Sequence, residues 1–287
     1  MARAAAVARA HPPEGRFLRV AGRRVHALVA GRGPDLVLIH GASGHAGDFS
    51  FDLLPRLAAR WRVIALDRPG LGWSEPIADP TPAAQARHLA AAAAALGARR
   101  PVVLGHSFGG AVALAWALER PGELAALALL APASHPWRGG LGPLYETLAR
   151  PLPGRALAPL LAALAPPASV ARTFAEIFAP QPVPAGYMAH FGPAVTLRPA
   201  VMRENARQLA ALKPALRAAA PRYAALDLPV EIVQGDADTI VPLAAHAGRL
   251  AEALPRARLR VLPGIGHMPH HAAPAEVVAA LERLRPG

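Results

Sequence analysis

The sequence contains no cysteine, and this absence excludes several kinds of chemistry at once. Disulfide bonds, thiolate nucleophiles and sulfur-ligated metal sites all require that residue. A chain without cysteine fits a reducing compartment, so we expect a cytoplasmic protein. The sequence also has no uncharged apolar run of about 20 residues, which is the length that a membrane-spanning helix needs. We therefore expect no transmembrane segment.

Acidic residues are scarce beside basic ones: 19 Asp and Glu face 31 Lys and Arg, for a formal net charge of +12. Such an excess attracts polyanions where the positive charges are concentrated. Lys213 is the only lysine, however, and the arginines stand singly or in pairs such as Arg23 and Arg24, with no basic run. This pattern favours a solvated arginine surface, and we do not expect a nucleic acid partner.

The N-terminal segment lacks the apolar stretch of about 7 to 15 residues that a secretory signal requires. Residues 1–15 carry Arg3 and Arg9 among alanines, and we expect them to form a flexible tail. The chain as a whole has 287 residues, of which 53% are hydrophobic. That content is enough for one large core domain, with or without a smaller inserted lobe.

Short apolar runs alternate with helical segments from residue 16 onward. Such continuous runs are typical of strands that are buried on both faces. The expected strands are 17–20, 25–29, 36–39, 62–66, 101–104, 124–130, 230–233 and 258–262. Between residues 134 and 228 no such run occurs, and closely spaced prolines separate short helical stretches. We expect an α/β fold with a mostly parallel sheet, formed by residues 16–133 and 229–287, and a helical cap formed by residues 134–228.

A serine at the end of one expected strand has the surroundings of a nucleophile. Residues 105–109 read Gly-His-Ser-Phe-Gly and stand between a strand and a helix that starts near Gly110. The G-x-S-x-G pattern is informative in this context, because the serine then lies on a strained tight turn whose close neighbours must be small. The chain has only six serines, which makes a chance placement less plausible. Ser107 is the candidate nucleophile, and we expect the adjacent His106 to be structural.

A serine nucleophile needs a base and an acid that orients the base, and in this fold type the acid precedes the histidine. The aspartates after Ser107 are Asp227, Asp236 and Asp238. The last two follow the strand 230–233, at the edge of the sheet where the serine is expected. We favour Asp238, because the turn should point the second carboxylate toward that edge, and we keep Asp236, or a glutamate elsewhere, as the alternative.

Three histidines follow the last expected strand. We favour His267 as the base, because it lies nearest the strand end and glycines flank its approach. His270 and His271 are the alternatives. They precede a helix, where we expect them to lie on the surface.

Acyl transfer also needs backbone amides that bind an oxyanion. The expected donors are the amide of Phe108, directly after the nucleophile, and the amide of Ala42, in the loop after the third strand. His40 begins this loop, and we expect it to be a buried histidine that bonds the backbone and shapes the loop.

Taken together, these motifs resemble the alpha/beta hydrolase superfamily over nearly the whole chain. The resemblance is carried by His40-Gly41, Asp67 to Ser74, Gly105 to Gly109, Gly235 to Pro242 (G-x-x-D-x-x-x-P) and Gly266 to Pro269. It implies an alpha/beta hydrolase fold with an eight-stranded sheet and a cap inserted after the sixth strand. It also implies that Asp238, at the fourth position of its motif, is the acid. Related haloalkane dehalogenases and epoxide hydrolases carry aspartate at the position of Ser107, so the resemblance indicates a serine hydrolase instead.

The expected cap contains large apolar side chains that could line a substrate pocket or form the core of the cap. They are Trp137, Tyr145, Phe174, Phe178, Tyr187, Met188 and Phe191. As a lining they favour a small-molecule substrate that is uncharged or apolar. No group of histidines and carboxylates has metal-ligand spacing and no glycine-rich phosphate loop occurs, so we expect no metal and no organic cofactor.

The main hypothesis is hydrolysis of a carboxylic ester through an acyl-serine intermediate. The same three side chains could instead cleave carbon–carbon bonds of vinylogous diketones, transfer acyl groups or run perhydrolysis. An alternative of another class is a receptor-like member with slow turnover, or a binding protein with an inactive site.

Overall fold

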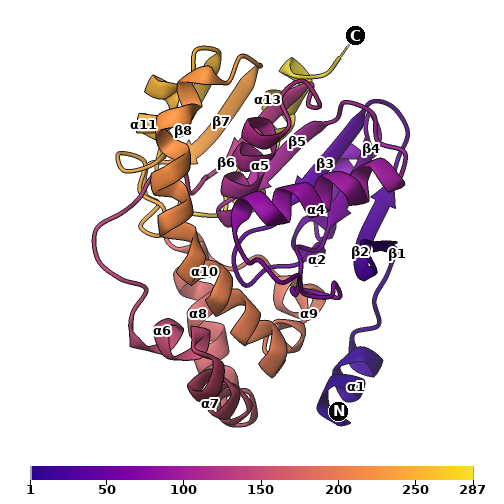
Figure 1. Cartoon of the computed structure of the whole chain (residues 1–287), viewed down its shortest axis with the longest axis vertical. Coiled ribbons are helices and arrows are strands. Elements are labelled where there is room, and N and C mark those ends of the chain that lie inside the picture. The colour runs from indigo at the N-terminus through magenta and orange to yellow at the C-terminus, as the bar shows by residue number, and fades with distance from the viewer. Residues whose placement is uncertain (1, 287) are drawn as a thin grey trace.

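An eight-stranded sheet forms the centre of the protein (Figure 1). The computed structural model describes residues 2–286, and the side chains of residues 6–286. The strands are β1 (Arg16–Val20), β2 (Arg23–Ala30), β3 (Asp35–Ile39), β4 (Arg62–Leu66), β5 (Val102–His106), β6 (Ala126–Leu130), β7 (Val230–Gly235) and β8 (Ala257–Leu262). They lie in the order β1-β2-β4-β3-β5-β6-β7-β8. Strand β2 pairs antiparallel with β1 and β4, and the other pairs are parallel, which confirms the mostly parallel sheet.

Alternate residues of the central strands pack against opposite faces of the sheet. In β3, Val37 and Ile39 belong to one hydrophobic core, whereas Leu36 and Leu38 belong to the other. Because side chains alternate with a period of two, a strand between two cores is apolar at every position. This is the physical reason why an uninterrupted apolar run predicts such a strand.

Helices cover both faces of the sheet. One core is closed by α4 (Pro82–Ala95), α5 (Phe108–Glu119) and α11 (Ala247–Ala253). The other is closed by α2 (Gly47–Ser50), α3 (Leu53–Leu57) and α13 (Pro274–Arg283), which α12 (Pro269–Ala272) precedes. Thr81 caps α4 by accepting a hydrogen bond from the amide of Ala84 at 3.3 Å, and Pro82 occupies the first helical position.

The chain between β6 and β7 is helical. It contains α6 (Pro143–Ala149), α7 (Pro151–Leu164), α8 (Pro167–Phe178), α9 (Tyr187–Phe191), the 3-10 turn η1 (Pro193–Val195), α10 (Pro199–Ala219) and the 3-10 turn η2 (Ala220–Ala225). Residues 134–228 are called the inserted segment below. Helices α6, α7, α8 and α10 each begin with a proline, so prolines here start helices as well as separating them. Figure 1 shows α6, α7 and α8 beyond one end of the sheet.

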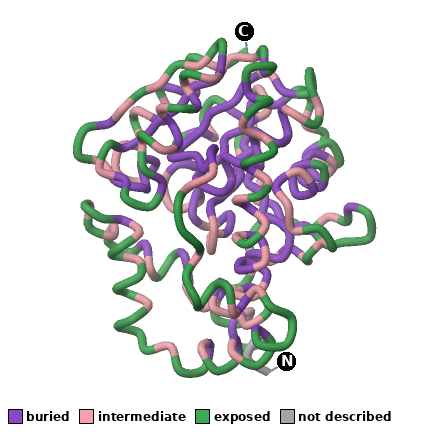
Figure 2. The backbone as a smooth tube through the Cα atoms, turned by 60° about the vertical axis from the view of Figure 1, so that its left-hand side comes forward, coloured by how far each residue is buried: buried purple, intermediate pink, exposed green. Residues whose placement is uncertain are grey.

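Burial differs between the sheet and the inserted segment. Figure 2 shows buried residues gathered around the sheet and long exposed stretches in the helices beyond it. Among the described residues, no single helix combines the length and the apolar composition that a membrane crossing needs. Helices α7 and α8 reach that composition only as a pair, which is bent by 102° at the break between them.

Within the segment expected to form a flexible N-terminal tail, residues 2–10 form helix α1 (Ala2–Ala10). Alanine has the highest helix propensity, and this segment is rich in it. Val7 of α1 is buried, and the ring of His11 lies against Gly192 of the inserted segment. Packing against the rest of the chain therefore adds to the local preference for a helix.

Candidate active site

Ser107 lies on the tight turn between β5 and α5. Its backbone has φ 53° and ψ −117°, a combination that a non-glycine residue keeps only where its surroundings enforce it. Hydrogen bonds from Ser107 N to Leu130 O (2.9 Å) and from Ala133 N to Ser107 O (3.0 Å) hold the turn against β6. The start of α5 approaches β3 so closely that a Cβ atom on Gly109 would stand 2.1 Å from Ile39 O. Glycine is therefore required at position 109, and the turn holds Ser107 in one place.

Ser107, His267 and Asp238 come together beyond the ends of β5, β8 and β7. His267 Nε2 lies 3.0 Å from Ser107 Oγ, and His267 Nδ1 lies 2.8 Å from Asp238 Oδ2. The three residues are nearly buried, with exposed fractions of 8% for Ser107, 5% for His267 and 4% for Asp238. The structure thus brings together the three side chains that the sequence predicts for nucleophile, base and acid.

The surroundings of Asp238 keep its carboxyl group ionised. Its Oδ1 accepts hydrogen bonds from the amides of Ile240 and Val241, both at 2.9 Å, and its Oδ2 accepts one from Gln234 Nε2 at 2.9 Å. Burial raises the pKa of Asp238, but the hydrogen bond and charge of His267, with the hydrogen bonds from Val241 and Gln234, outweigh this effect and lower the pKa below its ordinary value. An ionised carboxylate only accepts, so His267 carries a proton on Nδ1 and its Nε2 can accept the hydroxyl proton of Ser107.

The alternative acid, Asp236, has a different partner. It is exposed, and its Oδ1 accepts a hydrogen bond from the amide of Gly264 at 2.7 Å. This contact links the turn after β7 to the turn after β8. The structure therefore places Asp236 in a turn and Asp238 at the histidine.

The side chains of His270 and His271 are 0% and 1% exposed, so their expected surface position is wrong. His270 Nε2 lies 3.0 Å from Asp48 Oδ2, and His271 Nε2 lies 2.8 Å from Asp48 Oδ1. The hydroxyl of Tyr187 in α9 donates to the same Oδ1 at 2.7 Å. Burial opposes ionisation of Asp48, but the histidines beside it hold its pKa well below the ordinary value. Sequence reasoning missed Asp48 because it stands 222 positions before His270.

Asp48, His106 and His270 have a spacing that could suit a metal ion. Both carboxylate oxygens of Asp48 already accept hydrogen bonds, and His106 Nε2 bonds the carbonyl of His267 at 2.9 Å. Burial lowers the pKa of His106 well below its ordinary value, so its ring is neutral. Among the described residues, however, the buried Nδ1 atoms of His106 and His270 have no hydrogen-bond partner, so this polar cluster is only partly satisfied.

The loop after β3 packs directly against the serine turn. A Cβ atom on Gly41 would stand 3.2 Å from Ser107 Cβ. Phe108 is the first residue of α5, where an amide has no acceptor inside the helix. Within residues 2–286, neither the Ala42 amide nor the Phe108 amide donates a hydrogen bond. Both amides are therefore available as donors beside Ser107.

His40 joins the loops after β3 and β4. Its Nδ1 donates to Gly41 O at 2.9 Å, and its Nε2 accepts a hydrogen bond from the amide of Arg68 at 2.9 Å. Burial lowers the pKa of His40 to about 3, so the ring is neutral and can both donate and accept. Through these contacts His40 bonds the backbone of both loops, as expected from the sequence.

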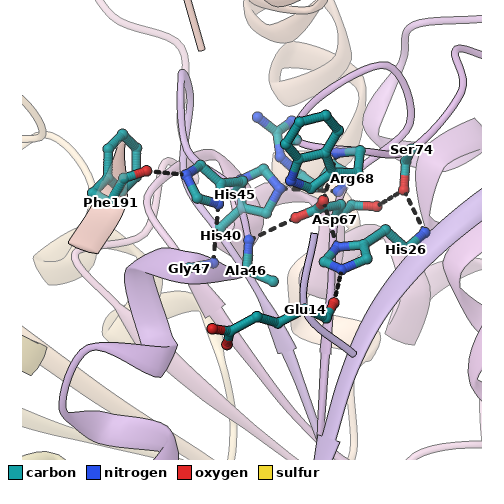
Figure 3. A network of polar contacts seen from close by, with 12 residues as sticks. Glu14, His26, His40, His45, Ala46, Gly47, Asp67, Arg68, Ser74 and Phe191 are labelled. Carbon is teal, nitrogen blue, oxygen red and sulfur yellow. Dashed lines mark hydrogen bonds and ion pairs between the residues drawn. The ribbon is translucent and has the colours of Figure 1, made fainter. Parts of the chain in front are cut away.

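Asp67 also links the loops after β3 and β4 through hydrogen bonds of its carboxylate (Figure 3). Its Oδ1 accepts from the amide of Ala46 at 2.6 Å, and its Oδ2 accepts from the amide of Trp73 at 2.7 Å and from His26 Nδ1 at 2.8 Å. Burial raises the pKa of Asp67, but the hydrogen bond and charge of His26 outweigh it and lower the pKa. The motif from Asp67 to Ser74 therefore supports the loop that carries Ala42.

Several predicted pocket residues form a buried cluster beside the candidate base. The cluster consists of Phe178, Tyr187, Phe191 and Met268, with Phe174 at its margin. Met268 directly follows His267, so the cluster adjoins the site. A cavity next to it is lined by Phe178, Gln181, Pro182, Pro184, Met268, His271 and Ala272.

The other predicted pocket residues lie elsewhere. Trp137 packs against the core that α5 covers, and Lys213 Nζ lies 5.6 Å from the centroid of its ring. Tyr145 is exposed on α6, and Met188 is partly exposed on α9. Apolar character alone does not distinguish packing from pocket lining, which is why the sequence grouped them together.

Known proteins match this architecture. The sequence pattern of the alpha/beta hydrolase fold family matches residues 34–274. The chain belongs to this family. An uncharacterised protein of Mycobacterium tuberculosis is 29% identical in an alignment that is 300 residues long and covers 95% of this chain and 81% of that protein.

Two further comparisons relate this alpha/beta hydrolase to a solved structure and to a named enzyme. An alpha/beta hydrolase fold protein from Burkholderia ambifaria has a TM-score of 0.78 and 29% identity, with 93% of this chain and 96% of that chain covered. A pimeloyl-(acyl-carrier protein) methyl ester esterase of Xanthomonas campestris is 41% identical over 115 residues, which cover 40% of this chain and 43% of that protein. The family and its esterase relatives identify this protein as a hydrolase.

Proposed function

We propose that this hydrolase cleaves a carboxylic ester or a similar acyl compound through an acyl-serine intermediate. The observation that carries the proposal is the chain of two hydrogen bonds from Ser107 Oγ through His267 to Asp238, at 3.0 and 2.8 Å. A serine hydroxyl is a weak nucleophile until a base within hydrogen-bond reach takes its proton. The esterase name of the Xanthomonas campestris relative supports an ester as the substrate class.

In the proposed acylation step, Ser107 Oγ attacks the acyl carbon while His267 Nε2 takes the hydroxyl proton. The acyl oxygen gains an electron pair and accepts hydrogen bonds from the amides of Ala42 and Phe108. When the carbonyl group re-forms, the bond to the leaving alcohol breaks and His267 returns the proton to that oxygen. Asp238 accepts from His267 Nδ1 throughout and stabilises the protonated ring.

In the proposed deacylation step, water replaces the alcohol and attacks the acyl carbon. His267 takes a proton from the water, and the same two amides bind the second oxyanion. Collapse of this intermediate breaks the bond to Ser107 Oγ, which recovers its proton from His267. The products are a carboxylic acid and the alcohol, and the enzyme returns to its starting state.

We also propose that the inserted segment forms a cap over this site. Gln181 Oε1 accepts a hydrogen bond from the amide of Gly266 at 2.9 Å. A Cβ atom on Gly266 would stand 2.0 Å from Ala179 O, so the segment lies directly on the loop that carries His267. The buried aromatic cluster beside this loop supports a small apolar acyl or alcohol group in the substrate.

Hydrolysis of a series of p-nitrophenyl esters tests the proposal, with Ser107→Ala compared with Ser169→Ala. Ser169 is an exposed serine of α8 and serves as the matched control. We expect Ser107→Ala to lower kcat by at least about 10⁴-fold, because the covalent step is lost, while Ser169→Ala retains wild-type rates. Equal rates in wild type and Ser107→Ala would contradict the proposal. Turnover of a vinylogous diketone without turnover of any ester would move the assignment to carbon–carbon hydrolysis.

A further inference from the structure

Arg68 is a charged side chain that is buried without a carboxylate partner. Its exposed fraction is 0%, and its Nη1 donates to Gln85 Oε1 at 3.1 Å and to Gln208 Oε1 at 2.9 Å. In the part of the chain that the structure describes, no carboxylate pairs with it, and Glu204 pairs with Arg207 instead. A buried cation is destabilising unless its surroundings compensate for lost water. Packing alone therefore gives no reason for an arginine here.

Two further contacts join Arg68 to both parts of the candidate oxyanion site. Its Nη2 donates to Gly41 O at 3.0 Å. Its guanidinium carbon lies 4.1 Å from the centroid of the Phe108 ring. Gly41 O belongs to the same peptide group as the Ala42 amide, and Phe108 supplies the second amide. Arg68 thus contacts the peptide group that carries the Ala42 amide and the side chain of the residue that carries the Phe108 amide.

The contact with Gly41 O fixes the direction of the Ala42 amide. In a planar trans peptide, the C=O and N–H bonds point in opposite directions. A donor that holds the Gly41 carbonyl toward Arg68 therefore holds the Ala42 N–H away from Arg68. His40 Nδ1 donates to the same carbonyl at 2.9 Å and the Gly44 amide donates to it at 3.3 Å, so with Arg68 three donors hold this peptide. Rotation of the peptide would remove one donor from the oxyanion site.

We infer that Arg68 is a positioning residue for the oxyanion site, which orients the Ala42 amide and, from behind the Phe108 ring, favours negative charge on the acyl oxygen. The inference rests on the function proposed above. Both effects grow as charge develops on that oxygen, so they stabilise the transition state more than the bound substrate. Loss of Arg68 should therefore lower kcat and leave KM nearly unchanged.

Two substitutions separate the charge of Arg68 from its shape. Methionine has a similar length but neither charge nor donors. Lysine keeps the charge but lacks the planar fork that reaches Gly41 O and both glutamines together. Arg68→Lys should therefore retain part of the rate that Arg68→Met loses.

Arg198 offers a matched control, because it makes the same kinds of contact with other residues. Its guanidinium carbon lies 4.4 Å from the centroid of the Trp73 ring, and its Nε donates to Val195 O at 2.9 Å. Arg198→Met removes a stacked, partly buried guanidinium without touching Gly41 or Phe108. Its kcat should stay within about twofold of wild type.

The test measures p-nitrophenyl ester hydrolysis together with inhibition by a trifluoromethyl ketone, whose adduct with Ser107 carries the oxyanion. Arg68→Met should lower kcat and the affinity for the ketone by about 100-fold each, with KM within about threefold of wild type. Arg68→Lys should lower both by about tenfold. Circular dichroism and the thermal midpoint check that each variant folds, and Arg68→Lys carries the test if Arg68→Met does not fold. A merely structural role would not make kcat and the ketone affinity fall in parallel at constant KM.

The outcomes distinguish this inference from the proposed function. A folded Arg68→Met protein with kcat within about threefold of wild type overturns the inference, as does an equal loss of kcat in Arg198→Met. If only Arg68→Lys folds, an unchanged kcat in that variant has the same meaning. A wild-type protein that neither hydrolyses esters nor binds the ketone overturns the proposed function, and the inference with it.

Discussion

Asp236 and Asp238 are two positions apart, yet their surroundings give them different chemistry. Asp238 is buried and accepts hydrogen bonds from two amides, Gln234 and His267. Asp236 is exposed and accepts one from the amide of Gly264. Only a side chain that bonds His267 Nδ1 can fix which ring nitrogen carries the proton, and this is the property that a general base requires.

The pair provides a matched test of this difference. Asp238→Asn can present its amide group to His267 Nδ1, which would shift the proton to Nε2 and leave no acceptor for the proton of Ser107. We expect kcat of Asp238→Asn to fall by about 10³- to 10⁴-fold, and kcat of Asp236→Asn to stay within about twofold of wild type. Steady-state ester hydrolysis measures both variants. The reverse order would make Asp236 the acid.

At the scale of elements, the sequence predicts best where one local pattern decides the structure. The run at 36–39 predicts β3 because a strand between two cores is apolar at each position. Thr81 and Pro82 predict the start of α4 through local capping and backbone geometry. The serine turn belongs to the same class, since its glycines are required within a few residues of Ser107.

Elements that depend on distant partners were predicted less well. Helix α1 packs against the inserted segment, which a local pattern does not reveal. Helix α11 begins only at Ala247, because the chain first turns and the Gly248 amide donates to Leu243 O at 2.9 Å. Asp48 and Arg68 form hydrogen bonds with partners that lie far away in the sequence, and no spacing rule predicts such contacts.

The whole molecule contains several histidines that folding keeps neutral. Burial lowers the pKa of His40 to about 3, and lowers the pKa values of His135 and His246 to about 4. The unfolded chain binds protons at these positions below a pH of about 6.5, whereas the folded chain does not until the pH is much lower. Burial lowers the pKa of His26, but Asp67 raises it by more, so that residue acts in the opposite sense.

Stability should therefore fall as the pH falls from about 6.5 toward 4, by about 1.4 kcal/mol per pH unit for each histidine that stays neutral in the folded state. Urea unfolding at a series of pH values measures this slope. His246 Nδ1 accepts from the amides of Ser134 and His135, both at 3.3 Å, and asparagine offers an acceptor in a similar place. His246→Asn should reduce the slope by one histidine's share. An unchanged slope in this variant, or a flat profile in wild type, would contradict the argument.

The central claim is that Ser107 is a nucleophile activated by His267. The most direct measurement is the intact mass of the protein after treatment with a fluorophosphonate, which phosphonylates activated serines and does not depend on the unknown substrate. We expect a single adduct on wild type and on Ser169→Ala, and none on Ser107→Ala. An unlabelled wild type, or an adduct that persists in Ser107→Ala, would contradict the claim.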